Sequence, residues 1–359
     1  MNKIRMGVIG LGGISTAHIE GILNSPDGEL VAICDIREEV LKDKGVKYGI
    51  PESRRFKNHI ELLQCPDVDA VSICTPNKAH YHIAKDVIYY GKPFILEKPV
   101  TLNYQQALEL KELTNSKKIP NMVAFSYRFK AALRFAKWII EQGYLGRIFH
   151  IYVQYFQSWA INEEVPLVWR FIKEYSGSGA LGDLGSHMID IARFLIGDFV
   201  KVCGHVGTFV ERRKKIGSDE YGEVDVDDYC HFMAELEDGV IGNFCITRDA
   251  YGRGNYQRVE VYGSKGGLVY NLDKKGDHID TIEVCIGDLY GRARDYHEIP
   301  VPSQFKAEQM QSFFDIVNGK GDGLAATIDD GYVNQYIIDC ILESTRLGKW
   351  VTLEKTNKI

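Results

Sequence analysis

The chain has 359 residues, 45% of them hydrophobic, and a formal net charge of −6. This length exceeds what one small core needs and predicts two domains. The negative charge argues against nucleic acid or an acidic membrane surface as the main partner, and no apolar stretch reaches the about 18 residues that a membrane span needs. The eight cysteines form no Cys-x-x-Cys pair, and an apolar run begins at Ile4. We therefore expect a cytoplasmic protein without a signal peptide.

The N-terminal segment reads as strand, glycine turn, helix, strand and acid. An apolar run ends at Gly10, a helix-like stretch follows, and a second apolar run ends on Asp35. This order is typical of a dinucleotide-binding βαβ unit, in which glycines permit the turn and the approach of a pyrophosphate. A carboxylate 23 residues beyond Gly12 suits the ribose hydroxyls, and the third small position holds Ser15. The predicted cofactor residues are Gly10, Leu11, Gly12, Gly13, Ile14, Asp35, Ile36 and Arg37. The negative charge of Asp35 favours NAD over NADP, although Arg37 is of a type that accommodates a 2′-phosphate.

Strand-like and helix-like segments go on alternating to about Phe125, which predicts a parallel, Rossmann-type sheet over residues 1–126. Ligands of such sheets bind at the carboxyl ends of the strands. Two motifs lie there. The first is Thr75-Pro76-Asn77 with His80, a cofactor wall or simply a well-made turn; His80 and His82 diverge by about 200° on a helix, so no metal site is expected. The second is Glu97-Lys98-Pro99, in which Glu97 and Lys98 are expected to contact the cofactor. Lys98 is a ligand-crevice residue or an ordinary surface lysine, and the Lys98–Pro99 bond is a candidate for the cis form.

Residues 127–359 are richer in strands. Apolar segments begin near residues 147, 199, 228, 240, 259 and 268, and their joints resemble hairpin turns. They predict a mainly antiparallel, open sheet with one prominent helix over about 181–195 and two helices near the C-terminus. A broad free sheet face suggests a homodimer or homotetramer. The basic and then acidic stretch 211–228 is interpreted as a solvated hairpin or loop.

A glycine-rich segment, residues 177–190, contains Asp183 and His187. Four residues apart on a helix, these side chains share one face, and a carboxylate beside an imidazole suits a proton acceptor. The glycines let the backbone approach something closely. The alternative is a buried, hydrogen-bonded histidine with a capping aspartate, and Asp190 is interpreted as structural.

The chain contains, in order, the motifs Gly10-x-Gly12, Thr75-Pro76-Asn77, Glu97-Lys98-Pro99 and Asp183-x-x-x-His187, and the segment 326–331. Together they resemble the glucose–fructose oxidoreductase / inositol dehydrogenase / MocA (Gfo/Idh/MocA) family, and the resemblance extends over nearly the whole chain. The resemblance implies catalysis by Lys98 and His187 with Asp183 at the substrate. It also implies that Trp169-Arg170 reaches the cofactor, as a similar pair does in some anhydrosugar reductases. Residues expected at the edges of a cleft between the domains, as substrate contacts, are Tyr127, Arg128, Gln157, Trp159 and Trp169.

The implied reaction is reversible hydride transfer between nicotinamide and a secondary alcohol of a sugar, anhydrosugar or inositol. His187 would take the hydroxyl proton, and Lys98 would stabilise the alkoxide. Two alternatives remain open: an NAD-dependent glycosidase that oxidises its sugar transiently and eliminates the glycosidic group, and a catalytically silent sugar sensor.

Overall fold

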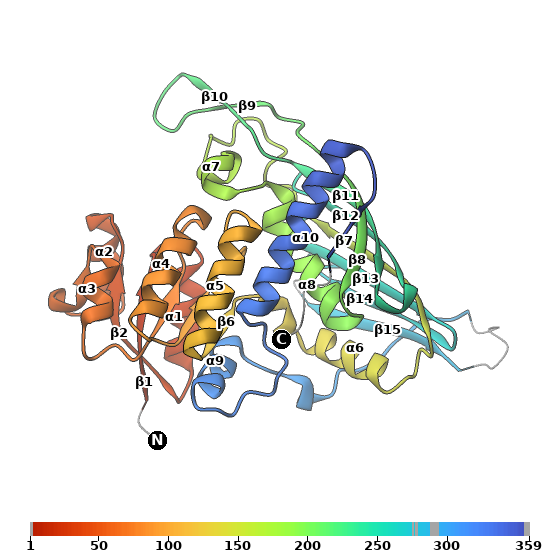
Figure 1. Ribbon diagram of the computed structural model, residues 1–359, viewed down its shortest axis with the longest axis horizontal. Coiled ribbons are helices and arrows are strands. Elements are labelled where there is room, and N and C mark those ends of the chain that lie inside the picture. Colours follow the sequence, from red (N-terminus) through yellow and green to blue (C-terminus); the bar gives the residue numbers. More distant parts are fainter. Residues whose placement is uncertain (1–2, 275, 277–278, 288–293, 355–359) are drawn as a thin grey trace. The chain divides into compact units, whose positions relative to one another are not determined.

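The computed structural model describes residues 3–274, 276, 279–287 and 294–354 (Figure 1). The chain divides into two compact units. The first runs to Ser126 and includes Ala307–Tyr332, and the second comprises Tyr127–Lys306 and the chain from Val333 onward. Met1 and Asn2, part of the segment that argued against a signal peptide, lie outside the described residues.

The first unit contains a six-stranded parallel sheet in the order β3-β2-β1-β4-β5-β6. Its strands are β1 (Ile4–Ile9), β2 (Gly28–Cys34), β3 (Arg55–Phe56), β4 (Ala70–Ile73), β5 (Phe94–Leu96) and β6 (Asn121–Val123). The helices between them are α1 (Ser15–Asn24), α2 (Glu38–Lys47), α3 (His59–Gln64), α4 (Asn77–Tyr89) and α5 (Tyr104–Lys117). The near-continuous burial of β1, β4 and β5 fits a parallel sheet whose faces are covered. The predicted Rossmann-type sheet is confirmed.

One predicted boundary needs correction. The sequence suggested that everything after residue 126 belongs to the second domain, but Ala307–Tyr332 return to the first unit. This segment contains α9 (Gln309–Val317), which packs against α1 and β6, and the start of α10 (Ile328–Leu347). Gly28 shows how close the packing is, since a Cβ there would lie 2.6 Å from the Phe314 ring.

The second unit contains a nine-stranded sheet in the order β16-β15-β14-β13-β7-β12-β11-β8-β17. Its neighbours are antiparallel except for the parallel pair β7–β12, so the predicted mainly antiparallel sheet is confirmed. The strands are β7 (Ile148–Phe156), β8 (Phe199–Gly207), β11 (Tyr229–Leu236), β12 (Ile241–Thr247), β13 (Tyr256–Gly263), β14 (Gly266–Leu272), β15 (Asp280–Ile286), β16 (His297–Glu298) and β17 (Val351–Thr352). The charged stretch forms the separate hairpin β9 (Arg212–Lys214) and β10 (Tyr221–Glu223).

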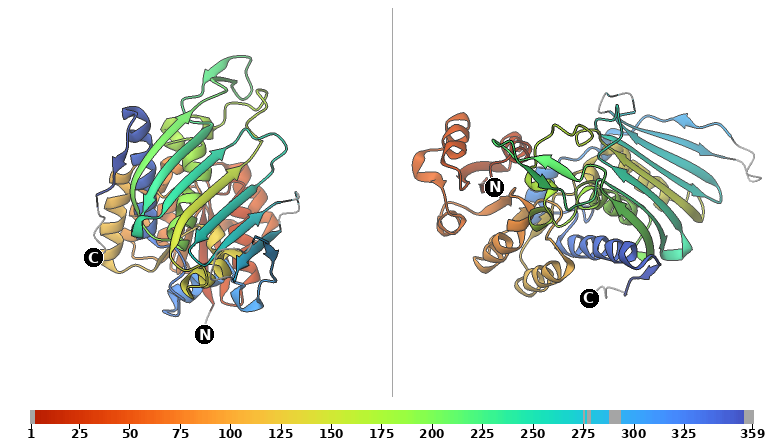
Figure 2. Two further views of the ribbon diagram at one scale, coloured as in Figure 1. Left: turned by 90° about the vertical axis from the view of Figure 1, so that its right-hand side faces the viewer. Right: turned by 90° about the horizontal axis from the view of Figure 1, so that it is seen from above.

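One face of this sheet is buried and the other is open. In β11, buried Cys230, Phe232 and Ala234 alternate with the more exposed His231 and Met233, as expected for a sheet with one packed face. Helices α6 (Ala131–Glu141) and α8 (Ser186–Leu195) pack against the sheet. The left view of Figure 2 shows the broad strands of β7, β11, β12 and β13 with no helix in front of them.

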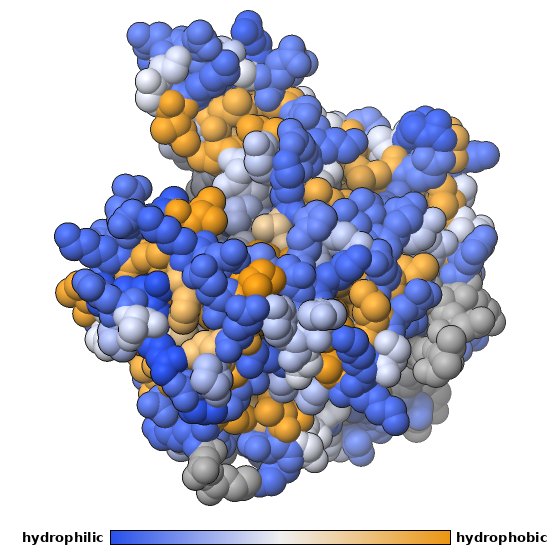
Figure 3. Space-filling model, turned by 60° about the vertical axis from the view of Figure 1, so that its left-hand side comes forward, coloured by the Kyte–Doolittle hydropathy of each residue, from blue (hydrophilic) through white to orange (hydrophobic). Residues whose placement is uncertain are grey.

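Among the described residues, none of the helices is both long and apolar enough to cross a membrane. On the face seen in Figure 3, hydrophilic side chains predominate and hydrophobic ones gather in separate patches. All eight cysteines are free thiols, and Cys34 and Cys74 are among the buried ones.

Candidate active site

The glycine turn after β1 requires glycine at its first position. Gly10 has a φ of 87°, and a Cβ there would lie 2.7 Å from Cγ2 of Thr75 and 2.8 Å from the carbonyl oxygen of Cys74. A side chain at this position is therefore excluded by both backbone strain and a clash. Gly10 thus brings the carboxyl ends of β1 and β4 together.

The next two glycines face open space. A Cβ at Gly12 or Gly13 would meet nothing within 4 Å. Within the described chain, no protein acceptor takes the N–H groups of Gly12, Gly13 or Ile14. Ser15 is buried, and its hydroxyl donates to the carbonyl of Gly12 at 2.6 Å, so a small polar residue serves in the third position. Open space beside unpaired N–H groups at the start of α1 fits a pyrophosphate.

Asp35, directly after β2, is a fixed and ionised carboxylate. Its side chain is 5% exposed, and it accepts hydrogen bonds from the N–H of Leu11 at 2.8 Å and from the backbone and guanidinium of Arg37 at 2.9–3.0 Å. Burial by itself would raise the pKa of Asp35, but the bonds from Arg37 and Leu11 lower it. The neighbouring Ile36 is exposed. The acid predicted for the ribose is therefore anchored to the glycine turn and partly neutralised by Arg37.

The turn after β4 is tied to the turn after β5 by His80. The His80 ring is fully buried, with one nitrogen 2.8 Å from the Thr75 carbonyl oxygen and the other 2.8 Å from that of Pro99. The sequence predicted a direct cofactor contact for His80, but this arrangement makes it a bridge between two loops instead. Pro76 is the N-terminal cap residue of α4, and Asn77 is the first residue of the helix.

The residues after β5 rest on a buried ion pair. Nε2 of His18, on α1, lies 2.9 Å from Oε1 of Glu97, and Nδ1 lies 2.7 Å from the Ser72 hydroxyl. Burial would lower the pKa of His18, but the neighbouring Cys74 thiol and the Glu97 carboxylate raise it to about 10. The other oxygen of Glu97 accepts the backbone N–H of Lys98 at 3.2 Å. The Glu97 side chain predicted to bind cofactor is thus engaged with His18 and positions Lys98, whose bond to Pro99 is cis as proposed.

In the second unit, the segment carrying Asp183 and His187 is anchored by a residue far along the chain. The carboxylate of Asp227 accepts the N–H groups of Gly179 at 2.7 Å and Leu181 at 2.6 Å, and its carbonyl accepts that of Ala180 at 2.8 Å. A Cβ at Gly179 would lie 1.8 Å from the Asp227 carbonyl oxygen. The sequence predicted that these glycines let the backbone approach another group closely, and at Gly179 that group is the backbone of Asp227.

The single helix predicted over about residues 181–195 consists of a π-helical turn followed by an α-helix. Leu181–Gly185 forms a π-helical turn, and α8 begins at Ser186. Such turns are rare and occur often at functional sites. Asp183 therefore lies in the π-helical turn and His187 in the first turn of α8.

The ring of His187 is buried beside two tyrosines that also contact each other. Its centroid lies 4.6 Å from that of Tyr127 and 6.4 Å from that of Tyr155. Their hydroxyls are 2.8 Å apart, and that of Tyr155 donates to Oδ1 of Asn255 at 2.6 Å. Burial, together with Tyr127 and Asp183, raises the pKa of Tyr155 well above its ordinary value, so its hydroxyl stays neutral.

The same network reaches two predicted substrate residues. Nε2 of Gln157 lies 3.1 Å from Oδ1 of Asn255, and the indole N–H of Trp159 donates to Oε1 of Gln157 at 2.9 Å. Tyr127, Gln157 and Trp159 are therefore brought together, as expected. Arg128 does not join this group, because its buried guanidinium pairs with buried Asp190 at 2.6 Å. That pair makes Asp190 structural, as predicted, and makes Arg128 structural as well, which corrects its assignment as a substrate contact.

Two arginines approach Asp183. Nη2 of Arg248, directly after β12, donates to Oδ2 at 3.1 Å, and Nε of Arg170 lies 3.9 Å from the same oxygen. The Arg170 guanidinium lies 4.4 Å from the ring centroid of Trp169. The predicted Trp169-Arg170 pair is thus stacked beside a predicted catalytic residue.

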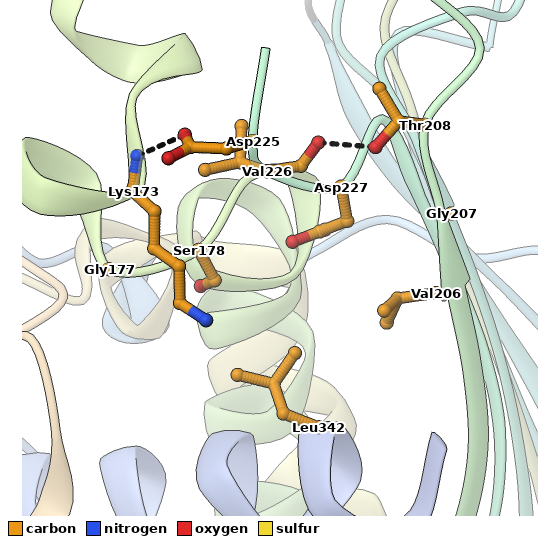
Figure 4. Close-up of a pocket in the computed structure, with 10 residues that line it drawn as sticks. All are labelled: Lys173, Gly177, Ser178, Val206, Gly207, Thr208, Asp225, Val226, Asp227 and Leu342. Atoms are coloured by element: carbon orange, nitrogen blue, oxygen red, sulfur yellow. Dashed lines mark hydrogen bonds between the residues drawn. The ribbon is translucent and has the colours of Figure 1, made fainter. Parts of the chain in front are cut away.

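A cavity of about 220 Å³ is lined in part by Gly177, Ser178 and Asp227 (Figure 4). Around it, the Asp225 carboxylate accepts the Lys173 N–H at 2.6 Å and the Thr208 hydroxyl donates to the Val226 carbonyl at 2.7 Å. These polar groups hold the loop that presents Asp227. Among the described residues, no group of three or more His, Cys, Asp or Glu side chains is arranged to hold a metal ion.

Both units match models of one family. Residues 4–125 match an oxidoreductase family with an NAD-binding Rossmann fold, and residues 133–269 match the GFO/IDH/MocA C-terminal domain. The chain belongs to the Gfo/Idh/MocA oxidoreductase family.

Similar Gfo/Idh/MocA proteins cover the whole chain. Levoglucosan dehydrogenase of Pseudarthrobacter phenanthrenivorans is 29% identical over 98% of each chain, and inositol 2-dehydrogenase of Rhizobium meliloti is 26% identical over 98% of this chain and 99% of its own. A solved structure of levoglucosan dehydrogenase with NADH and levoglucosan is 28% identical, with a TM-score of 0.89 over 99% of this chain and 100% of that one.

The sequence did not reveal four residues that contact the predicted site residues or the segment that carries them: Tyr155, Asp227, Arg248 and Asn255. Tyr155 and Asn255 look like ordinary strand and loop residues. Arg248 offers a weak signal, because Arg248-Asp249 is a charged pair directly after an apolar strand. Asp227 is 48 residues from Gly179, so no local pattern links them.

Proposed function

We propose that this protein is an NAD-dependent dehydrogenase that oxidises a secondary alcohol of a sugar, anhydrosugar or inositol, reversibly. The observation that carries the proposal is the burial of His187 beside Tyr127 and Tyr155, in the same segment as Asp183. Membership of an oxidoreductase family, and relatives named levoglucosan and inositol dehydrogenase, support the substrate class.

The cofactor is assigned to the glycine turn, with its ribose at Asp35. When bound, NAD supplies the hydride acceptor. The chain's own part begins with His187, whose imidazole takes the hydroxyl proton of the substrate. The ammonium group of Lys98 lies after β5 in a loop that Glu97 holds. There it would stabilise negative charge on the substrate oxygen, an effect worth several kcal/mol in a dry site.

Asp183 and the polar network recognise the substrate's other hydroxyls. A carboxylate accepts hydrogen bonds from hydroxyl donors, and the oxygens and amides of Tyr127, Gln157 and Asn255 offer both donors and acceptors. The face of Trp159 suits the apolar side of a sugar ring. We assign Trp169 and Arg170 to contacts with the cofactor.

A panel of sugars, anhydrosugars and inositols should be screened with NAD and NADP while NADH formation and products are followed. We expect NADH formation with at least one polyol, and its loss in His187→Ala. Release of an aglycone without net NADH would support the glycosidase instead. Tight sugar binding without turnover would support a sensor.

We further propose that the protein is a homodimer or homotetramer built through the open face of the nine-stranded sheet. Tyr152, Met233 and Ile241 project there from neighbouring strands and are 40%, 45% and 38% exposed. Apolar side chains grouped on one face favour burial against another chain. Light scattering should give a multiple of 40.7 kDa, and Met233→Asp should lower it. A mass near 40.7 kDa for the unmodified protein at micromolar concentration would contradict the proposal.

A further inference from the structure

Arg248 is among the most deeply buried charged side chains of the second unit. It is 1% exposed, and its guanidinium carbon lies 5.1 Å from the ring centroid of Trp159. Nη2 donates to the carbonyl of Gly179 at 3.0 Å and to Oδ2 of Asp183 at 3.1 Å. A buried guanidinium is costly unless a carboxylate compensates its charge. Asp183 supplies that charge.

Arg170 competes only weakly with Arg248 for the Asp183 carboxylate. Arg170 lies 3.9 Å from Oδ2 of Asp183, beyond hydrogen-bond distance, and its side chain is 43% exposed, so water screens it. In the described part of the chain, Nε and Nη1 of Arg248 have no hydrogen-bond partner. The contact with Asp183 is therefore the ion pair that holds Arg248.

Several titratable groups surround the pair. Tyr155 faces Asp183 from β7. Asp227 and Asp249 interact electrostatically with Arg248, and Arg213 lies close enough to interact with both Asp249 and Arg248. Asp227 is occupied by backbone N–H groups. Arg248 thus hydrogen-bonds Asp183 directly, through a guanidinium that is itself buried.

We propose that Arg248 is a positioning residue: it fixes one oxygen of Asp183 and keeps this carboxylate ionised, so that Asp183 presents a defined acceptor to a substrate hydroxyl. The substrate role of Asp183 rests on the proposed function, but the ion pair itself does not. The planar guanidinium also stacks on Trp159, which a lysine ammonium cannot reproduce. The pair therefore links the carboxylate to the aromatic face proposed for the sugar ring.

The test compares Arg248→Lys and Arg248→Met with Arg213→Lys. Arg213 is an equally buried arginine whose guanidinium donates to the backbone carbonyls of Ala160, Asn162 and Val165, so it controls for loss of a buried guanidinium. Circular dichroism first establishes that each variant folds. We expect Arg248→Lys to raise KM for the polyol and lower kcat/KM by about 10- to 100-fold, the value of one charged hydrogen bond. Arg213→Lys should keep the KM of the unmodified enzyme.

The pH dependence separates positioning from a structural role. Without the cation, protonation of Asp183 becomes easier, so the acid limb of kcat/KM should move to higher pH in Arg248→Met. The same shift should appear, without any substrate, in the carbon-13 NMR titration of the Asp183 carboxyl, assigned by Asp183→Asn. A folded Arg248→Met variant with an unchanged NMR midpoint would overturn the inference. Lack of polyol turnover in the unmodified enzyme would overturn the proposed function alone, because the NMR shift does not depend on it.

Discussion

Replacing Gly179 by alanine should disrupt the segment that carries Asp183 and His187. A Cβ at this position would lie 1.8 Å from the carbonyl oxygen of Asp227, and real Cβ atoms essentially never come within 3.0 Å of a neighbour. The obstacle is backbone, so no side chain can rotate away. The two segments must part by more than an ångström.

That separation breaks the hydrogen bonds at this junction. Two go from N–H groups to the buried Asp227 carboxylate, at 2.7 and 2.6 Å, and one goes to its carbonyl at 2.8 Å. Bonds to a charged group contribute about 1.5–3 kcal/mol each and a neutral one about 1 kcal/mol. Partial loss of all three predicts a destabilisation of about 3–5 kcal/mol, a large part of the 5–15 kcal/mol typical of a folded protein.

Denaturant unfolding, followed by fluorescence, measures this change. Gly12→Ala is the matched control, because a Cβ there meets nothing within 4 Å. It should leave stability within about 1 kcal/mol of the unmodified protein while weakening NADH binding, since the methyl group occupies the space assigned to the pyrophosphate. A Gly179→Ala protein as stable as Gly12→Ala, with normal turnover, would refute this reasoning.

Four further predictions concern cofactor choice, catalysis and stability. Asp35→Ser should shift the ratio of kcat/KM values from NAD toward NADP, because the carboxylate that opposes a 2′-phosphate is removed while Arg37 remains; equal use of both cofactors by the unmodified enzyme would contradict it. Lys98→Ala should lose most turnover yet retain NADH binding in a fluorescence titration, and the residual activity of His187→Ala should rise with pH as hydroxide replaces the missing base. Burial and the neighbouring Asp228 raise the pKa of Asp249 to about 6. The folded state therefore keeps the Asp249 carboxyl protonated at pH values where the unfolded chain has already released that proton. The free energy of unfolding consequently falls as pH rises from about 4 to about 6. Asp249→Asn should therefore resist urea better than the unmodified protein at pH 7 and equally well below about pH 4; equal resistance at pH 7 would argue against this protonation.

The N-terminal segment, up to Ser126, could be predicted closely because its signals are local. Gly10, Gly12 and Asp35 each follow a buried strand by one to three residues, and parallel strands place their carboxyl ends at one edge. The lysine after β5 belongs to the same edge by the same rule. The antiparallel class of the second sheet was also predictable, since period-two burial and turn residues recur along it.

What the tertiary structure alone decided depends on contacts between distant residues. Nothing near Gly179 in the sequence indicates that Asp227 occupies its open side, or that Arg248 pairs with Asp183 across 65 positions. The same reason explains the errors. Arg128 and His80 looked available because a sequence shows a polar residue's type and spacing but not its partner, and Asp190 and the Pro99 carbonyl turned out to be those partners. Likewise α9 returned to the first unit because Gly28 and α1 leave room for Phe314. A charged side chain can be buried only where other groups compensate its charge, and the fold, rather than any local sequence pattern, brings those groups to it.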